Sequence, residues 1–116
     1  MPDLVGRKLY GGTIREEVKI VGLQDGYLHV ALSGEIDFAK AEDFYTAVME
    51  GYKATPANLC FDCAALEFID STTLGTFVKI LKAVKTDGYT MKLRSLQPKI
   101  KKLFVICALD TIMVLE

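Results

Sequence analysis

Three consecutive hydroxyl residues follow a carboxylate at the point where an apolar run changes to helical spacing. The carboxylate is Asp70, and the hydroxyl residues are Ser71, Thr72 and Thr73. Hydroxyl residues commonly cap a helix, with Ser71 either at the cap or within the first turn. The start of a helix also carries unpaired N–H groups and positive partial charge, which favour an anion. Ser71 is therefore both a candidate cap and a candidate carrier of a phosphate.

The other side chains that could do chemistry have simpler explanations. Cys60 and Cys63 lie three apart in a predicted strand, so their sulfurs should point to opposite faces and be structural. Cys107 lies on the apolar stripe of a predicted helix and is expected in the core. His29 is out of phase with its apolar neighbours, so it should face the other side of the sheet, without a nucleophile or an orienting acid nearby. We therefore predict no catalytic residue, no metal, no cofactor and no enzyme activity.

Alternating or continuous apolar residues predict the strands that position these groups. The first two strands alternate around an Asp-Gly pair, which predicts an antiparallel hairpin. Ser33-Gly34 is expected to end the second strand, and the third is apolar enough to be buried on both faces. The predicted strands are Glu17–Leu23, Tyr27–Leu32, Asn58–Cys63, Tyr89–Arg94 and Ile112–Leu115.

Three segments have apolar residues at helical spacing. The first runs from about Phe38 to Tyr52. The second starts near Ser71 and ends at Asp87-Gly88, since glycine suits the end of a helix. The third carries Pro98 in its first turn, where a missing N–H costs nothing.

These segments follow one another in the order β-β-α-β-α-β-α-β. The alternation predicts a single α/β domain over residues 13–116, with a mostly parallel mixed β-sheet, an N-terminal antiparallel hairpin and helices packed on the sheet. Residues 1–12 are expected to form a flexible N-terminal arm, and the strand order stays open. Functional loops lie at the carboxyl ends of parallel strands, so Asp37 and Asp70 are expected to flank Ser71.

Composition narrows the classes of function. The chain has 116 residues, of which 51% are hydrophobic, and its 14 basic and 15 acidic residues give a net charge of -1. Without a basic excess, general nucleic-acid binding is not expected. No apolar run approaches the roughly 20 residues of a membrane span, so no membrane insertion is expected. Three cysteines are an odd count, and no secretory segment opens the chain, which favours the cytoplasm.

Two segments taken together resemble a known family. Leu32–Asp37 has the sequence Leu-Ser-Gly-Glu-Ile-Asp, and Phe68–Gly75 has the sequence Phe-Ile-Asp-Ser-Thr-Thr-Leu-Gly. With Lys102–Phe104 and Ala108–Asp110 they resemble the STAS domain. More narrowly, they are similar to the anti-sigma factor antagonists of bacterial partner-switching systems. The resemblance extends from about Glu17 to the end of the chain.

The resemblance implies a phosphorylation switch. In that family, an anti-sigma factor that is itself a serine kinase phosphorylates the serine after the turn aspartate, which corresponds to Ser71, with Thr72 as a second candidate. The unphosphorylated antagonist binds the anti-sigma factor and frees a sigma factor, phosphorylation releases the antagonist, and a serine phosphatase resets it. Whether the chain also forms a weak homodimer is left open by the resemblance. The implied partner-binding residues are Asp37, Asp70, Ser71, Thr72, Thr73 and Gly75.

One residue departs from the family pattern, and two other functions stay open. The family usually has glycine at the position of Thr73, so a β-branched side chain is expected where the partner docks. An alternative function is a STAS subunit of a transporter, or a sensor of a small ligand, without a phosphate cycle. A small α/β enzyme is less favoured because no set of acid, base and nucleophile converges.

Overall fold

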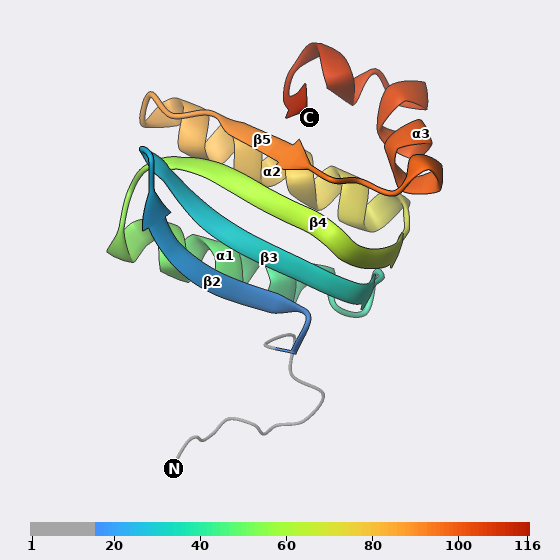
Figure 1. Ribbon diagram of the computed structural model, residues 1–116, viewed down its shortest axis with the longest axis horizontal. Coiled ribbons are helices and arrows are strands. Elements are labelled where there is room, and N and C mark those ends of the chain that lie inside the picture. Colours follow the sequence, from blue (N-terminus) through green and yellow to red (C-terminus); the bar gives the residue numbers. More distant parts are fainter. Residues whose placement is uncertain (1–15) are drawn as a thin grey trace.

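Five strands form one mixed sheet in the computed structural model, which describes residues 16–116 (Figure 1). The arm expected over residues 1–12 lies outside these residues. The first strand pairs antiparallel with the second at one edge, and all other neighbours are parallel, so the predicted hairpin and mostly parallel sheet are confirmed. In spatial order the strands are β2 (Val18–Gln24), β3 (Tyr27–Ile36), β4 (Asn58–Ile69), β5 (Met91–Arg94) and β6 (Val114–Leu115).

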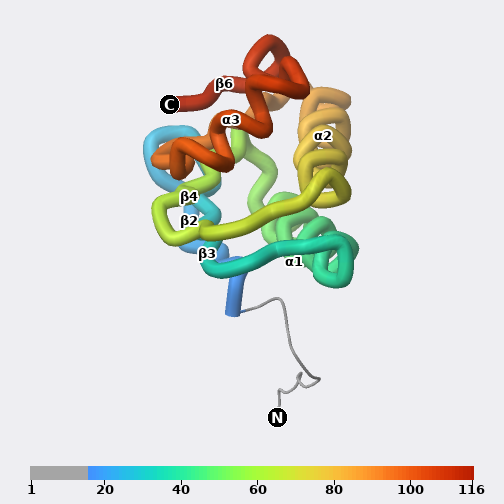
Figure 2. The backbone as a smooth tube through the Cα atoms, turned by 90° about the vertical axis from the view of Figure 1, so that its right-hand side faces the viewer, coloured from blue at the N-terminus to red at the C-terminus, as the bar shows by residue number. Residues whose placement is uncertain are grey.

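Three helices connect the parallel strands, namely α1 (Ala41–Ala54), α2 (Ser71–Thr86) and α3 (Pro98–Ile106). A short 3-10 helix (Leu109–Thr111) precedes β6. Figures 1 and 2 show α1 and α2 side by side on one face of the sheet, with α3 at the end where β3 and β4 finish. The predicted order of strands and helices is therefore confirmed.

Four phenylalanines form the centre of the core. Phe44 of α1, Phe61 of β4, Phe77 of α2 and Phe104 of α3 are all fully buried. The ring centroid of Phe77 lies 5.1 Å from that of Phe44 and 5.4 Å from those of Phe61 and Phe104, in edge-to-face contacts. Each such contact contributes about 0.5–1.5 kcal/mol beyond the burial of the rings. Phe77 therefore holds α2 in one position against the sheet and both other helices.

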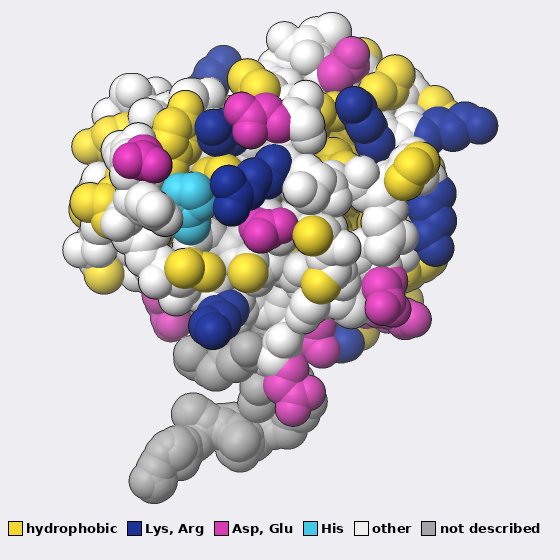
Figure 3. Space-filling model, viewed as in Figure 1, with side chains coloured by type: hydrophobic (Ala, Val, Ile, Leu, Met, Phe, Trp, Pro, Cys, Tyr) yellow, Lys and Arg dark blue, Asp and Glu magenta, His cyan; other side chains and the backbone are white. Residues whose placement is uncertain are grey.

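The opposite face of the sheet is not covered by any of the described helices, and Figure 3 shows basic, acidic and hydrophobic side chains mixed on it. Two ion pairs lie there: Lys92 with Glu116 at 3.2 Å, and Arg94 with Asp62 at 3.8 Å. Such exposed pairs contribute little to stability. Charged and hydrophobic side chains are therefore interspersed on this face (Figure 3).

Two strands run further than the apolar pattern predicted. β3 continues through Ser33-Gly34 to Ile36, because Gly34 takes a φ of 67° at a register irregularity inside the strand and does not end it. β4 continues past Cys63 to Ile69 because it stays paired with the extended β3. The turns at this end of the sheet are therefore shorter than expected.

The first helix starts later than predicted, at Ala41 and not at Phe38. Asp37 folds residues 38–40 into a turn: its carbonyl accepts a hydrogen bond from the Lys40 N–H at 3.0 Å, and its carboxylate accepts one from the Ala39 N–H at 3.1 Å. The predicted limits of α2 are confirmed, with Gly88 at a φ of 88° just after the helix.

The cysteines divide into two buried and one exposed. Cys60 and Cys63 are buried, and only Cys63 belongs to the core beneath the helices, as strand alternation predicts. The prediction that Cys107 lies in the core is wrong, because the residue caps the end of α3 and is exposed. The helix ends at Ile106, and Ala108, directly after Cys107, takes a left-handed φ of 59°, so the apolar stripe of α3 does not continue through Cys107.

Candidate functional site

The carboxyl ends of β3 and β4 meet at one edge of the sheet. Glu35 pairs with Phe68, and Ile36 pairs with Ile69, in parallel register. Asp37 and Asp70 are the next residues after these strands, so the two acidic turns lie next to each other, as the sequence predicted. Figure 2 looks at this end of the molecule and shows the β3–α1 and β4–α2 connections running across it.

Asp70 joins these two turns through its carboxylate. It is the N-cap of α2, and its Oδ1 accepts a hydrogen bond from the Thr73 N–H at 3.0 Å. Its Oδ2 accepts a hydrogen bond from the Phe38 N–H, in the β3–α1 turn, at 2.8 Å. One side chain therefore satisfies backbone donors of two segments that are far apart in the sequence.

The same contacts keep Asp70 charged. Burial tends to raise the pKa of this carboxyl, but hydrogen bonds from the backbone of Thr73 and Phe38 and from the Thr73 hydroxyl outweigh burial and hold the pKa below its ordinary value. At neutral pH the start of α2 therefore carries a fixed negative charge, which compensates the positive end of the helix dipole.

Ser71 is the first residue of α2, and its side chain takes no part in the hydrogen bonds that Asp70 and Thr73 make within the described residues. The residue is exposed, and its hydroxyl makes no hydrogen bond to any of residues 16–116. Asp70 is the cap, so of the two placements considered for Ser71, the first turn is the observed one. Thr72 is also exposed. Both hydroxyls are therefore accessible to a partner protein.

Thr73 lies beneath the exposed residues Ser71 and Thr72. Its side chain is fully buried, and its hydroxyl lies 2.6 Å from the carbonyl oxygen of Ile36 and 3.1 Å from Oδ1 of Asp70. The expectation that Thr73 faces a docking partner is therefore wrong, because hydrogen bonds to the end of β3 and to the cap turn its side chain inward. Thr73 supports the surface and is not part of it.

Gly75 is exposed one turn further along α2. A Cβ added to it would meet nothing within 4 Å, and its φ is not positive, so neither space nor backbone conformation in this chain requires glycine. Glycine inside a helix costs about 0.5–1 kcal/mol relative to alanine. Close approach by another molecule is one reason to keep it.

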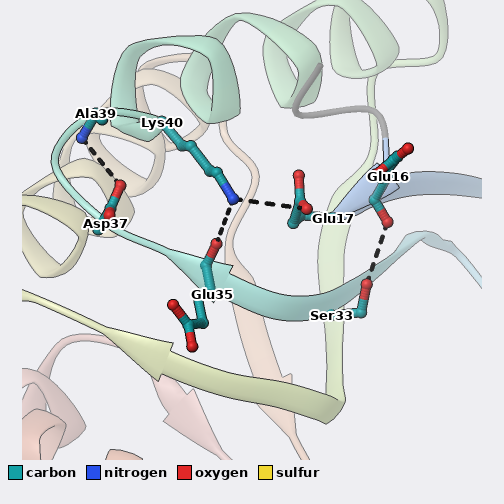
Figure 4. Close-up of polar contacts among 7 residues, drawn as sticks. All are labelled: Glu16, Glu17, Ser33, Glu35, Asp37, Ala39 and Lys40. Carbon is teal, nitrogen blue, oxygen red and sulfur yellow. Dashed lines mark hydrogen bonds and ion pairs between the residues drawn. The ribbon is translucent and has the colours of Figure 1, made fainter. Parts of the chain in front are cut away.

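The β3–α1 turn is held by a small polar cluster, shown in Figure 4. The Lys40 ammonium donates to the Glu35 carbonyl at 3.2 Å and lies 3.6 Å from the Glu17 carboxylate. Together with the Asp37 contacts described above, these interactions fix the turn. Asp37 is half-buried, and its carboxylate lies on the side of the turn away from Lys40 (Figure 4).

Sequence reasoning missed two phenylalanines at this edge. Phe38 is 71% exposed and Phe68 is 46% exposed, whereas the chain's four other phenylalanines are fully buried. The apolar spacing predicts a helix that begins at about Phe38, although the position of Phe38 directly after a turn aspartate is a signal that could place it outside the helix. Exposed aromatic side chains are frequent anchors of protein interfaces.

The residues that the structure describes form neither a metal site nor a membrane-spanning helix. Among residues 16–116, no three or more His, Cys, Asp or Glu side chains gather in a way that could hold a metal ion. None of the helices in this range is long and apolar enough to cross a lipid bilayer.

Known proteins resemble this chain in both sequence and fold. The STAS domain family model matches residues 19–116. The anti-sigma-B factor antagonist of Bacillus subtilis (strain 168) is 33% identical over 90 residues, which cover 73% of this chain and 77% of that protein. A candidate anti-sigma factor antagonist from Thermotoga maritima has 28% identity and a TM-score of 0.69, with 84% of this chain and 82% of that chain covered. An anti-sigma factor antagonist from Mycobacterium paratuberculosis has 27% identity and a TM-score of 0.66, with 84% and 80% covered.

Proposed function

Because the chain belongs to the STAS domain family, we propose that it is an anti-sigma factor antagonist whose binding is controlled by phosphorylation of Ser71. In this proposal the unphosphorylated chain binds an anti-sigma factor that is also a serine kinase, and so frees a sigma factor. Phosphorylation releases the chain, and a serine phosphatase restores it. The chain then acts in the cytoplasm as a regulator and not as an enzyme, and the names of its relatives support this role.

The observation that carries the proposal is that the exposed Ser71 hydroxyl has no hydrogen-bond partner among residues 16–116. A serine at the start of a helix is ordinarily explained by capping, but here Asp70 fills that position. The Ser71 hydroxyl is exposed and free of hydrogen bonds to the described residues, so modifying it breaks no hydrogen bond among them. Thr72 is the second candidate because it is exposed beside Ser71.

Electrostatics favours release after phosphorylation. A phosphate adds about -1.5 to -2 charge at neutral pH. The helix dipole offers it only about 0.3–1 kcal/mol, and one N–H of the first turn, that of Thr73, is already bonded to Asp70. A kinase must bring the terminal phosphate of its nucleotide to this hydroxyl, so the product phosphate meets like charge inside an interface, which costs several kcal/mol. Repulsion therefore outweighs local stabilisation.

The proposed partner surface surrounds Ser71 on the edge where β3 and β4 end. This surface differs in two ways from the partner-binding residues expected from the sequence. Thr73 is left out because its side chain is buried, and the exposed Phe38 and Phe68 are added. Aromatic side chains at the centre of an interface contribute most of its affinity, and the charged groups around them determine its specificity. The surface consists of Asp37, Phe38, Phe68, Asp70, Ser71, Thr72 and Gly75.

The direct test is a phosphopeptide map. Incubation of the chain with a candidate anti-sigma factor kinase and ATP is expected to add one phosphate, which mass spectrometry places on Ser71. Ser71→Ala should abolish the modification, whereas Thr72→Ala should keep it. A phosphate on Thr72 alone would contradict the site. Stable co-purification with a membrane complex or a retained ligand, unaffected by changes at Ser71, would favour the transporter or sensor role.

Phe38→Ala is expected to weaken binding to the anti-sigma factor at least tenfold while changing the free energy of unfolding by less than about 0.5 kcal/mol. The ring is 71% exposed, so the fold loses little when it is removed, whereas an interface loses a buried aromatic group. Isothermal titration calorimetry and urea denaturation measure the two effects. Val21→Ala is the control, since Val21 is 60% exposed on β2, outside the proposed surface. Equal loss of binding in both variants would contradict the surface.

A further inference from the structure

Two hydrogen-bonded links connect the start of α2 to the end of β3. In the first, Oδ2 of Asp70 accepts from the Phe38 N–H at 2.8 Å. In the second, the Thr73 hydroxyl donates to the carbonyl of Ile36, the last residue of β3, at 2.6 Å. The Asp70 carboxylate and Thr73 are also bonded to each other, through the Thr73 N–H at 3.0 Å and its hydroxyl at 3.1 Å. The four residues therefore form a closed hydrogen-bonded unit.

The Thr73 hydroxyl is the buried centre of this unit. It has one proton, and the shorter distance identifies the Ile36 carbonyl as its main acceptor, with Asp70 as a second. The side chain is fully buried, so water cannot take the place of a lost hydroxyl. Removing the hydroxyl would leave a buried carbonyl without this donor and would loosen the Asp70 carboxylate.

We propose that Thr73 is a positioning residue, which holds the turn that carries Phe38 against the helix start that carries Ser71. Phe38 lies two residues after Ile36, so a hydrogen bond to the Ile36 carbonyl restrains the strand just before the turn. The Phe38 N–H depends in turn on Asp70, which Thr73 orients. The value of this arrangement for partner binding rests on the proposed function, but the positioning itself does not.

The chain offers a matched control in the same helix. Thr76 is also a buried threonine, at 8% exposure, and its hydroxyl donates to the Thr72 carbonyl at 3.1 Å, inside α2. Thr76→Val removes a buried hydroxyl of the same kind without breaking a link between elements. Thr73→Val keeps the volume of the side chain and removes only the link, and Thr73→Ser restores the hydroxyl.

The experiment compares backbone amide exchange by NMR in the parent chain and these three variants. Thr73→Val is expected to accelerate exchange of the Phe38 amide roughly tenfold, as loss of about one hydrogen bond requires. The same variant should raise the pKa of the Asp70 carboxyl, followed by its ¹³C resonance, because one of the hydrogen bonds to the ionised form is lost. Thr73→Ser should return both values toward those of the parent, and Thr76→Val should leave both unchanged.

Two results would overturn the proposal. One is acceleration of the Phe61 amide, in the central strand β4, by the same factor as Phe38, since that would mean global loss of stability. The other is an unchanged Phe38 amide in Thr73→Val. None of these measurements needs a partner or a phosphate, so failure of Ser71 to accept phosphate would contradict the proposed function and leave this inference intact.

Discussion

Ser71→Asp is expected to bind the anti-sigma factor at least a hundredfold more weakly than the parent chain, whereas Ser71→Ala should keep the parent affinity. The aspartate places a permanent negative charge beside Asp70, at the centre of the proposed partner surface. Like charges in a desolvated interface cost several kcal/mol, and a hundredfold loss corresponds to about 2.7 kcal/mol. Alanine removes a hydroxyl that bonds to none of the described residues, so it removes nothing that holds the surface together.

Isothermal titration calorimetry measures this difference, with Thr46→Asp as the control. Thr46 is an exposed threonine on α1, so this variant adds the same charge to a helix surface outside the proposed partner surface. Both aspartate variants should unfold within about 0.5 kcal/mol of the parent. If Ser71→Asp binds as tightly as the parent, charge at this position does not control binding.

Asp70→Asn is expected to lower the free energy of unfolding by about 2 kcal/mol at neutral pH, the range for hydrogen bonds to a charged group. The carboxylate accepts from the Thr73 N–H with one oxygen and from the Phe38 N–H with the other. An amide has a single oxygen, so its NH₂ group must face one of these two donors. Asparagine is otherwise a good cap, which isolates the contribution of the second oxygen and the charge.

The lowered pKa of Asp70 also predicts how the difference in stability between the parent and Asp70→Asn changes with pH. The pKa of Asp70 is lowered in the folded chain, so the stabilisation is fully present above the unfolded carboxyl's pKa of about 4 and is lost as the pH falls through the folded value. The gap in stability between the parent and Asp70→Asn should therefore be constant near neutral pH and shrink in acid. Urea denaturation over a series of pH values measures it.

Asp43→Asn is the matched control for loss of charge, because Asp43 is an exposed carboxylate in the first turn of α1. We expect this change to cost a few tenths of a kcal/mol, through the helix dipole alone. If Asp70→Asn costs no more than Asp43→Asn, the bridge to Phe38 contributes nothing to the fold.

Local patterns sufficed to predict the order of the elements and the pairing of the two acidic turns. Apolar spacing depends on which face of an element is buried, and each helix here buries one stripe against a single sheet. The ends of β3 and β4 were missed because strand pairing, and not the local sequence, extends them past Ser33-Gly34 and Cys63. Gly34 permits this with its positive φ, although the same residue type also ends strands.

The sequence predicted where the two acidic turns meet, but not the contacts between them. Serine and aspartate are nearly equal as caps, so the sequence left open which residue caps α2. A tertiary contact favours Asp70 as the cap, because only a carboxylate has a second oxygen free to accept from the Phe38 N–H. The inward side chain of Thr73 depends on a carbonyl 37 residues away in the chain, which no local pattern reveals.

The Ser71 hydroxyl, which makes no hydrogen bond within residues 16–116, also affects how a regulator of the proposed kind can diversify over evolutionary time. Since no hydrogen bond among the described residues depends on that oxygen, we expect that a duplicated gene can replace the serine and still encode a stable domain. Under the proposed function, alanine would fix the copy in its binding state, and an acidic residue would fix it in the released state. A single substitution could therefore change the proposed regulation without passing through an unstable ancestor.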